Sequence, residues 1–154
     1  MSNDIKIKVF TPFEGMSMFE LDRASTFFEK YSNDDNTDYS SVSKIIQAAI
    51  KQIPSFGGFI MLAYEGLDIV GGVVVNKTGM YANLPTNVLV YFTLKDFTTY
   101  KEIAEDLLKR AIDHSQGEIS VFWTPDNPMF NFLKDRGFVE NTTELRLLSS
   151  QLNS

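Results

Sequence analysis

Cysteine is absent from this sequence of 154 residues, and histidine occurs once, as His114. The chain therefore has no thiol nucleophile, disulfide or thiolate zinc site, and one imidazole cannot form a His-rich metal cluster. Glycine-rich phosphate loops and a Gly-x-Ser-x-Gly elbow are also missing, which argues against nucleotide-binding folds of those types and against a serine hydrolase. We expect His114 near the end of a helix, where the dipole favours a cation, in a structural role.

Basic residues are outnumbered, with 14 Lys and Arg against 20 Asp and Glu, which gives a net charge of −6. This balance argues against a nucleic-acid surface, since non-specific affinity comes mainly from basic side chains. Apolar runs at 59–63 and 69–75 are too short to span a bilayer, and the first residues lack the features of a signal peptide. We expect a cytoplasmic protein that binds neither nucleic acid nor membrane.

The composition, 44% hydrophobic with 13% aromatic, suits a single domain over residues 1–154 with a full core. Apolar periodicity in the first half predicts a one-sided strand, two helices around a polar loop, and a hairpin. Pro54 ends the second helix. The predicted elements are a strand at 5–9, helices at 16–31 and 42–53, a loop at 32–38, and strands at 59–64 and 69–76.

The second half alternates strands and helices. A capping side chain before Pro128 and a glycine at position 137 predict a short helix between them. Gly71 and Gly72 lie within a predicted strand and indicate a bulge or a close backbone approach. The remaining predicted elements are strands at 87–94, 119–123, 138–139 and 145–147, with a helix at 103–112.

This order of elements and the local sequence from position 87 onward resemble the GNAT superfamily of acyl-CoA N-acyltransferases. The strand LVYFTL at 89–94, the helix IAEDLL at 103–108, the turn PDNP at 125–128 and the segment FLKDRGF at 132–138 carry the resemblance. It implies an α/β fold with a mixed, mostly antiparallel sheet and helices on both faces. It also implies acetyl-CoA as cofactor.

The family's pyrophosphate motif, Arg/Gln-x-x-Gly-x-Gly/Ala, falls on residues 99–104, and only Ala104 agrees with it. Thr99 replaces the Arg/Gln and Glu102 replaces the central glycine. The spacing of Thr99 and Glu102 is that of a capping box, which would fill the helix N–H groups from within. The alternative is an open turn with Glu102 directed outward and Lys101 offsetting its charge. Tyr100 and Ile103 complete the predicted cofactor-binding turn.

The resemblance also implies roles for residues on either side of this turn. Main-chain groups of Phe92 and Leu94 would hold the pantetheine arm, and Asn127 lies in the family's Asn-containing turn. Leu133 stands where many members have a proton-donating tyrosine, and a leucine cannot donate a proton. Tyr91 and Asp126 are the candidates for proton transfer, and their alternative roles are packing and helix capping.

Two functions follow from these observations. The first is an acetyl-CoA-dependent N-acetyltransferase that acts on an amine of a small molecule or protein. The second is a catalytically degenerate protein of the same fold that acts as a binding or oligomerisation module, and a homodimer is compatible with both. The two predicted N-terminal helices and the loop at 80–86 would form the acceptor pocket, for which the sequence carries no chemical signature. The acidic balance favours a cationic acceptor.

Overall fold

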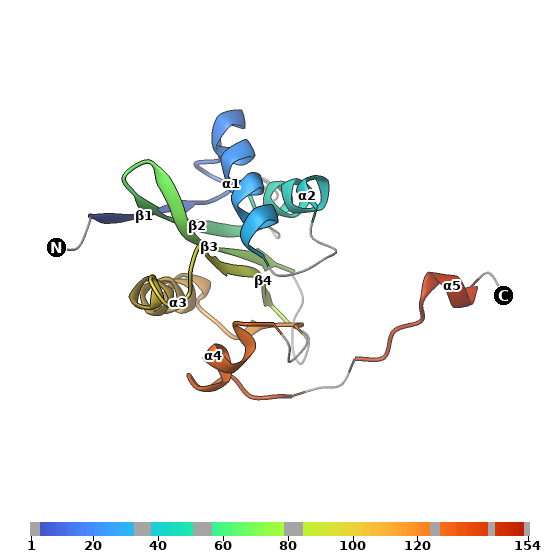
Figure 1. Cartoon of the computed structure of the whole chain (residues 1–154). Coiled ribbons are helices and arrows are strands. Elements are labelled where there is room, and N and C mark those ends of the chain that lie inside the picture. Colours follow the sequence, from blue (N-terminus) through green and yellow to red (C-terminus); the bar gives the residue numbers. More distant parts are fainter. Residues whose placement is uncertain are drawn as a thin grey trace.

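The computed structural model of the chain describes residues 4–32, 38–50, 57–78, 85–123, 127–141 and 144–152, and every structural statement below concerns these residues. It contains five strands and five helices (Figure 1). In chain order they are β1 (Ile5–Phe10), α1 (Met18–Tyr31), α2 (Tyr39–Ala49), β2 (Gly57–Glu65), β3 (Asp68–Lys77), β4 (Asn87–Leu94), α3 (Lys101–Ser115), β5 (Ile119–Ser120), α4 (Phe130–Lys134) and α5 (Ser149–Leu152).

The strands form one sheet in the order β1-β2-β3-β4-β5. The first three neighbouring pairs are antiparallel and the pair of β4 with β5 is parallel, so the sheet is mixed and mostly antiparallel, as expected. A turn of two residues joins β2 to β3, and Gly66 in it has φ +63°, a conformation that favours glycine. The predicted hairpin is therefore confirmed.

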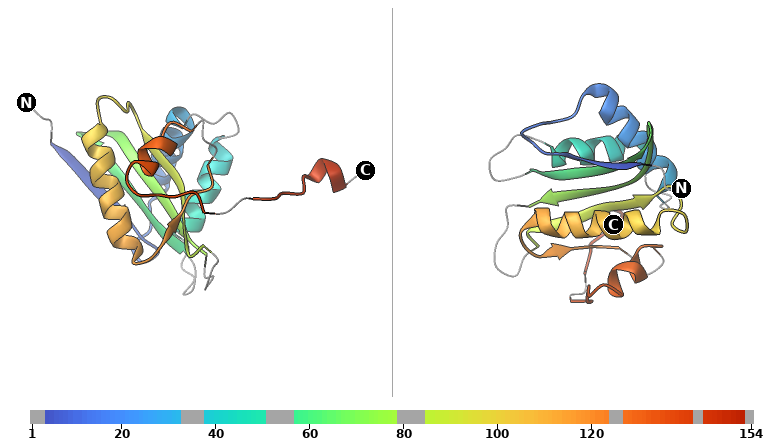
Figure 2. Two further views of the ribbon diagram at one scale, coloured as in Figure 1. Left: turned by 90° about the horizontal axis from the view of Figure 1, so that it is seen from below. Right: turned by 90° about the vertical axis from the view of Figure 1, so that its left-hand side faces the viewer.

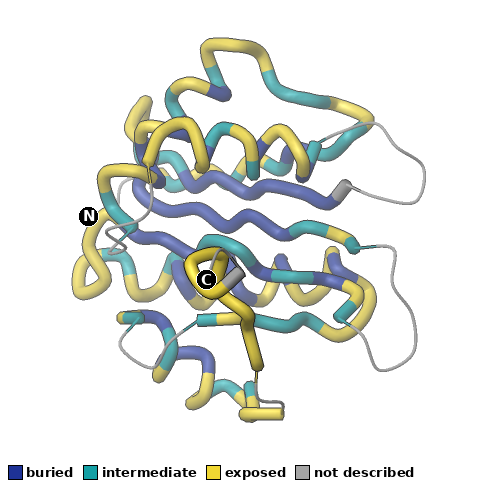
Figure 3. The backbone as a smooth tube through the Cα atoms, turned by 90° about the vertical axis from the view of Figure 1, so that its right-hand side faces the viewer, coloured by how far each residue is buried: buried dark blue, intermediate teal, exposed yellow. Residues whose placement is uncertain are grey.

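Helices cover both faces of the sheet (Figure 2). The helices α1 and α2 pack on one face, where residues such as Phe28, Ile46 and Val74 form one buried cluster. The helices α3 and α4 pack on the other face, where residues such as Leu107 and Phe132 form a second cluster. Figure 3 shows the central strands buried between partly exposed helices. This arrangement follows from helices that are apolar on one side only.

Helix boundaries are fixed by caps that sequence periodicity alone does not locate. Ser17 and Glu20 form a reciprocal capping box at the start of α1, with both hydrogen bonds 3.0 Å long. Asp38 caps α2 by accepting from the Ser41 backbone N–H. The helix α2 ends at Ala49, earlier than predicted, and Pro54, its predicted end, lies outside the described residues.

Gly71 and Gly72 were expected to mark a bulge or a close approach of the backbone, and the structure shows both. The register between β2 and β3 shifts so that Val70 has no partner, which places a bulge directly before Gly71. A Cβ at Gly72 would lie 2.8 Å from the Phe28 ring. The two glycines therefore allow α1 and α3 to pack close to the sheet from opposite sides.

The predicted strands at 138–139 and 145–147 are wrong. The described residues 138–141 and 144–148 form no strand, and Val139 and Leu145 are 79% and 94% exposed. The alternating pattern at 144–147 is present, but a strand needs a partner, and this segment leads away from the sheet (Figures 1 and 2). The strand β5 is also shorter than the predicted 119–123.

Candidate functional site

The sheet opens into a fork between β4 and β5. These two strands pair only at Asn87 with Ile119 and at Val88 with Ser120. Beyond Val88 the strand β4 continues to Leu94, and no described strand pairs with it on that side. The Trp123 indole N–H donates to the Val90 carbonyl oxygen (3.3 Å) near the base of the fork. The fork thus leaves one edge of β4 open inside the molecule.

A bulge in β4 lies at the base of this fork. Val74 is opposite Tyr91 and Val75 is opposite Leu89, so Val90 is the extra residue. The bulge shifts the alternation of side chains by one, since Leu89 and Phe92 both belong to the core on the α3 face although their spacing is odd. It also bends the strand, which explains why β4 and β5 separate at this point.

The backbone of β4 beyond the bulge directs polar groups into the fork. The Lys95 N–H donates to the Val70 carbonyl oxygen of β3 (2.8 Å), so the main-chain groups of Lys95 face β3. Because successive residues of a strand alternate in direction, those of Phe92 and Leu94 face away from β3, on the side of the fork. Their side chains, in contrast, are buried.

The N-terminus of α3 is not capped by any side chain of the described residues. The predicted capping box of Thr99 and Glu102 is wrong, because the N-cap of α3 is Tyr100, one residue later. The Thr99 hydroxyl donates to Asp96 (2.7 Å), a bond that lowers the pKa of that carboxyl group. The first intrahelical bond runs from the Ala104 N–H to the Tyr100 carbonyl (3.1 Å). The preceding N–H groups of the helix are therefore available to an anion.

The other residues of this turn differ in exposure. Lys101 and Glu102 are exposed, Ile103 is half-buried and Ala104 is buried against the core. The Tyr100 hydroxyl donates to a Glu65 carboxylate oxygen (3.1 Å), and burial together with this bond raises the pKa of Tyr100. The two charged side chains are thus directed to solvent, and one of them is a carboxylate in the first turn of the helix.

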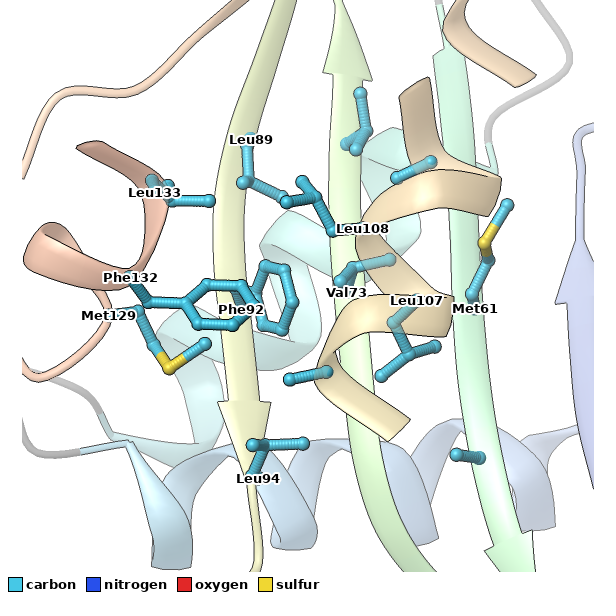
Figure 4. Close-up of a cluster of buried hydrophobic side chains, with 14 of the residues drawn as sticks. Met61, Val73, Leu89, Phe92, Leu94, Leu107, Leu108, Met129, Phe132 and Leu133 are labelled. Carbon is cyan, nitrogen blue, oxygen red and sulfur yellow. The ribbon is translucent and has the colours of Figure 1, made fainter. Parts of the chain in front are cut away.

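The helix α4 closes the same side of the fork. The Asn127 side chain accepts from the Met129 N–H (2.9 Å) and so orders the turn before the helix. Leu133 is buried beside Leu89, and the Phe132 ring lies 5.8 Å from that of Phe92, in an edge-to-face arrangement (Figure 4). Asp126, the second candidate for proton transfer, lies outside the described residues.

Tyr91, the first candidate for proton transfer, lies on the opposite face of the sheet from Leu133. Its ring stacks on Phe28 of α1 at a centroid distance of 5.4 Å and an interplanar angle of 27°. The side chain is half-buried. Nearby, the hydroxyl groups of Ser32 and Thr93 are hydrogen-bonded to each other (3.0 Å). This packing orients the Tyr91 ring near the bulge.

An ion pair that the sequence did not indicate joins α3 to α4. Arg136 donates to both carboxylate oxygens of Glu105, each 2.8 Å from its Nε, and the pairing lowers the pKa of Glu105. The guanidinium group also lies 3.7 Å from the centroid of the Phe132 ring. These partners are far apart in the sequence, so no local motif could have located this contact.

His114 lies in the last turn of α3, as expected, but not as a favoured cation. Its ring contacts Phe59 at a centroid distance of 4.4 Å, and burial, followed by the charge of Lys77, lowers its pKa. A surface depression of about 490 Å³ there includes Arg110 and lies at the end of α3 opposite the fork. His114 is therefore remote from the candidate site.

The described residues contain no group of three or more His, Asp or Glu side chains placed to hold a metal ion. Within the same residues, no helix is long and apolar enough to cross a membrane. The open edge of β4 and the N–H donors at the start of α3 define the candidate site. A cofactor held there would be bound mainly through backbone groups.

No family model and no curated protein matches the sequence. Solved structures do match its fold. The aminoglycoside N-acetyltransferase AAC(6')-Iy in complex with CoA is 12% identical with a TM-score of 0.67, over 97% of each chain. An aminoglycoside acetyltransferase from an uncultured soil metagenomic sample, in complex with sisomicin, is 13% identical with a TM-score of 0.63, over 94% of each chain.

An integron cassette protein from the mobile metagenome of V. cholerae is 17% identical with a TM-score of 0.63, and the match covers 97% of this chain and 95% of that one. At these identities the likeness concerns the fold. The chain has the fold of GNAT acetyltransferases, which confirms the fold that the sequence resemblance implied.

Proposed function

We propose that this chain, which has the GNAT acetyltransferase fold, binds acetyl-CoA in the fork between β4 and β5 and transfers its acetyl group to an amine. The observation that carries the proposal is the open edge of β4 beside the uncapped N-terminus of α3. A long cofactor with an anionic pyrophosphate fits these two features, since the edge offers strand-like hydrogen bonds and the helix offers N–H donors. One structural neighbour was solved with CoA.

In this arrangement the N–H groups of Lys101, Glu102 and Ile103 hold the pyrophosphate, and the Lys101 side chain adds a positive charge. Main-chain groups of Phe92 and Leu94 hold the pantetheine arm. The Glu102 carboxylate opposes binding, because two like charges 4 Å apart repel by about 1 kcal/mol in water and about 4 kcal/mol at an effective dielectric of 20. As Glu102 is exposed, its side chain has room to turn away.

When bound, the thioester supplies the acetyl group, and the amine nitrogen bonds to the carbonyl carbon as the carbon–sulfur bond breaks. The protein contributes backbone donors that orient and polarise the carbonyl. The Tyr91 hydroxyl would donate a proton to the leaving sulfur, and water or Asp126 would accept the proton that the amine loses. Buried Leu133 takes no part in either proton transfer.

The acceptor we propose is a cationic amine of a small molecule or protein. Two of the structural neighbours are aminoglycoside acetyltransferases, so they act on small molecules with several amino groups. The net charge of −6 favours an approaching cation through long-range attraction. The helices α1 and α2 contribute to the face of the sheet on which Tyr91 lies, and we place the acceptor on that face.

Removal of the Glu102 charge tests the cofactor site. We expect Glu102→Gln to bind acetyl-CoA about fivefold or more tightly than the original chain, because a repulsion of about 1 kcal/mol is removed. The matched control is Asp113→Asn, which removes the same charge at the far end of α3. Isothermal titration with acetyl-CoA gives both dissociation constants. No heat with any of the three proteins at millimolar cofactor would rule out the proposal.

The second candidate function is that of a binding or oligomerisation module without catalysis. It is favoured by Leu133, a buried leucine at the position where many GNAT proteins have a proton-donating tyrosine. Glu102→Gly distinguishes the two. If the protein is degenerate, acetyl-CoA binding appears only in the Glu102→Gly variant. If it is an enzyme, the original chain binds acetyl-CoA as well and consumes it in the presence of a polyamine or an aminoglycoside.

A further inference from the structure

Four large apolar side chains are exposed around the start of α1. Phe13, Met18, Phe19 and Leu67 are 92%, 80%, 69% and 84% exposed. Phe13 lies in the connection between β1 and α1, Met18 and Phe19 are the first residues of the helix, and Leu67 lies in the turn between β2 and β3. Exposed apolar side chains that are scattered singly are ordinary, but a group that lies together indicates an interaction surface.

Arg23 joins the two parts of this surface. Its guanidinium group lies 5.8 Å from the centroid of the Phe19 ring, one turn earlier in α1, and donates to the Leu67 carbonyl oxygen. The side of α1 that carries Phe19 therefore lies beside the turn between β2 and β3. We use the name apolar patch for the side chains of Phe13, Met18, Phe19 and Leu67.

The backbone beneath the apolar patch is ordered by its own hydrogen bonds. In the connection that carries Phe13, the Gly15 N–H donates to the Thr11 carbonyl oxygen (2.7 Å). The capping box of Ser17 and Glu20 then fixes the first turn of α1. Covering the patch thus costs little further backbone entropy.

The apolar patch has the area that a dimer needs. An aromatic side chain has a surface of about 200 Å², so the two phenylalanines alone expose about 300 Å². With Met18 and Leu67 included, two copies that cover each other's patch bury about 1,000 Å² in total, which is the lower end of the range for a specific protein interface.

The charges beside the patch favour a second copy as its occupant. Arg23 and Glu14 lie next to the patch, and neither forms an ion pair within the part of the chain that the structure describes. A two-fold axis can place the carboxylate of each copy near the guanidinium group of the other. A nucleic acid or an anionic lipid surface would instead meet the Glu14 carboxylate with like charge.

We propose that this chain forms a two-fold dimer in which the apolar patches of two copies cover each other. The contact is made by side chains and not by strand addition at the β1 edge, because Lys6 and Lys8 alternate along that strand and would face the same lysines of the second copy. Tyr91 stacks on Phe28 near the other end of α1, so the dimer leaves the proposed acceptor face open.

The first test is the mass of the full chain in solution, by sedimentation equilibrium at several concentrations. We expect twice the mass of one chain at the higher concentrations. The double variant Phe19→Asp with Leu67→Asp should raise the dimer dissociation constant about a hundredfold or more, because apolar contacts are lost and charges are buried. The matched control is Ile112→Asp with Val139→Asp, two side chains outside the patch that are also exposed, at 44% and 79%. Urea titrations check that each variant is folded.

The second test is hydroxyl-radical labelling of the original chain, which needs no variant. We expect the labelling of Met18 and Phe19 to fall severalfold as the concentration rises through the dissociation constant, while that of Ile112 stays the same. The mass of one chain at every concentration would overturn the proposal. A dimer in which the patch is labelled as in the monomer would also overturn it, as would a dimer that the Phe19 and Leu67 substitutions weaken no more than the control does.

Discussion

The Tyr91 hydroxyl can be separated from the Tyr91 ring, because the ring stacks on Phe28 whether or not the hydroxyl is present. We expect Tyr91→Phe to retain acetyl-CoA affinity but to lower kcat about a hundredfold, since one proton transfer is lost. The control is Tyr100→Phe, which removes a hydroxyl that bonds to Glu65. Steady-state kinetics against an amine acceptor give both values. An unchanged kcat in Tyr91→Phe would leave this tyrosine with a packing role alone.

His114 makes stability depend on pH in a defined direction. Its pKa is lowered in the folded protein by burial against Phe59, so below the ordinary histidine value the unfolded chain binds a proton that the folded chain does not. The stability from this site is complete above about pH 6.5 and falls as the pH drops toward the folded-state pKa. We expect the free energy of unfolding of His114→Phe, measured in urea, to fall less between pH 7 and pH 5 than that of the original chain. An identical pH profile in the variant would contradict this.

At the scale of elements, the contact between α3 and α4 depends on Arg136. Its planar guanidinium group binds the Glu105 carboxylate through both Nε and Nη2 and stacks on Phe132 at the same time, which lysine cannot reproduce. We expect Arg136→Lys to lower the free energy of unfolding by about 1 kcal/mol. The control is Arg110→Lys, whose exposed pair with Asp106 lies within α3 and should contribute less. Urea titrations measure both, and equal losses would contradict the assigned role.

The sequence predicted most elements because their apolar periods are long and regular. The bounds of β4 at 87–94 and the antiparallel pairing of β2 with β3 are the same in the structure. The cap of α3 was predicted wrongly because the N-cap of the helix is Tyr100, one residue after Thr99. Local spacing identifies residues able to cap a helix but does not fix the residue at which the helix begins.

The candidate site was predictable in position but not in shape. The sequence placed Phe92, Leu94 and the turn at 99–104 beside each other through the family resemblance. The fork itself depends on the extra residue Val90 in β4, and a bulge in a continuous apolar run leaves no sequence signal. The strands predicted at 138–139 and 145–147 do not form, because pairing depends on a partner that the sequence does not specify.

At the scale of the whole molecule, the sheet divides the protein into two layers with different tasks. The layer with α3 and α4 adjoins the proposed cofactor fork, and the layer with α1 and α2 faces the proposed acceptor. The C-terminal segment 144–148 lies apart from both layers.

The strand β3 lies in the middle of the sheet and contributes side chains to both buried clusters, with Val73 in one and Val74 in the other. Neither layer can open fully without exposing apolar surface of the other. We therefore expect the two layers to unfold as one cooperative unit, with the β3 amides among the slowest to exchange with solvent. Ligand binding on one face would then slow local opening on the other, although no side chain crosses the sheet.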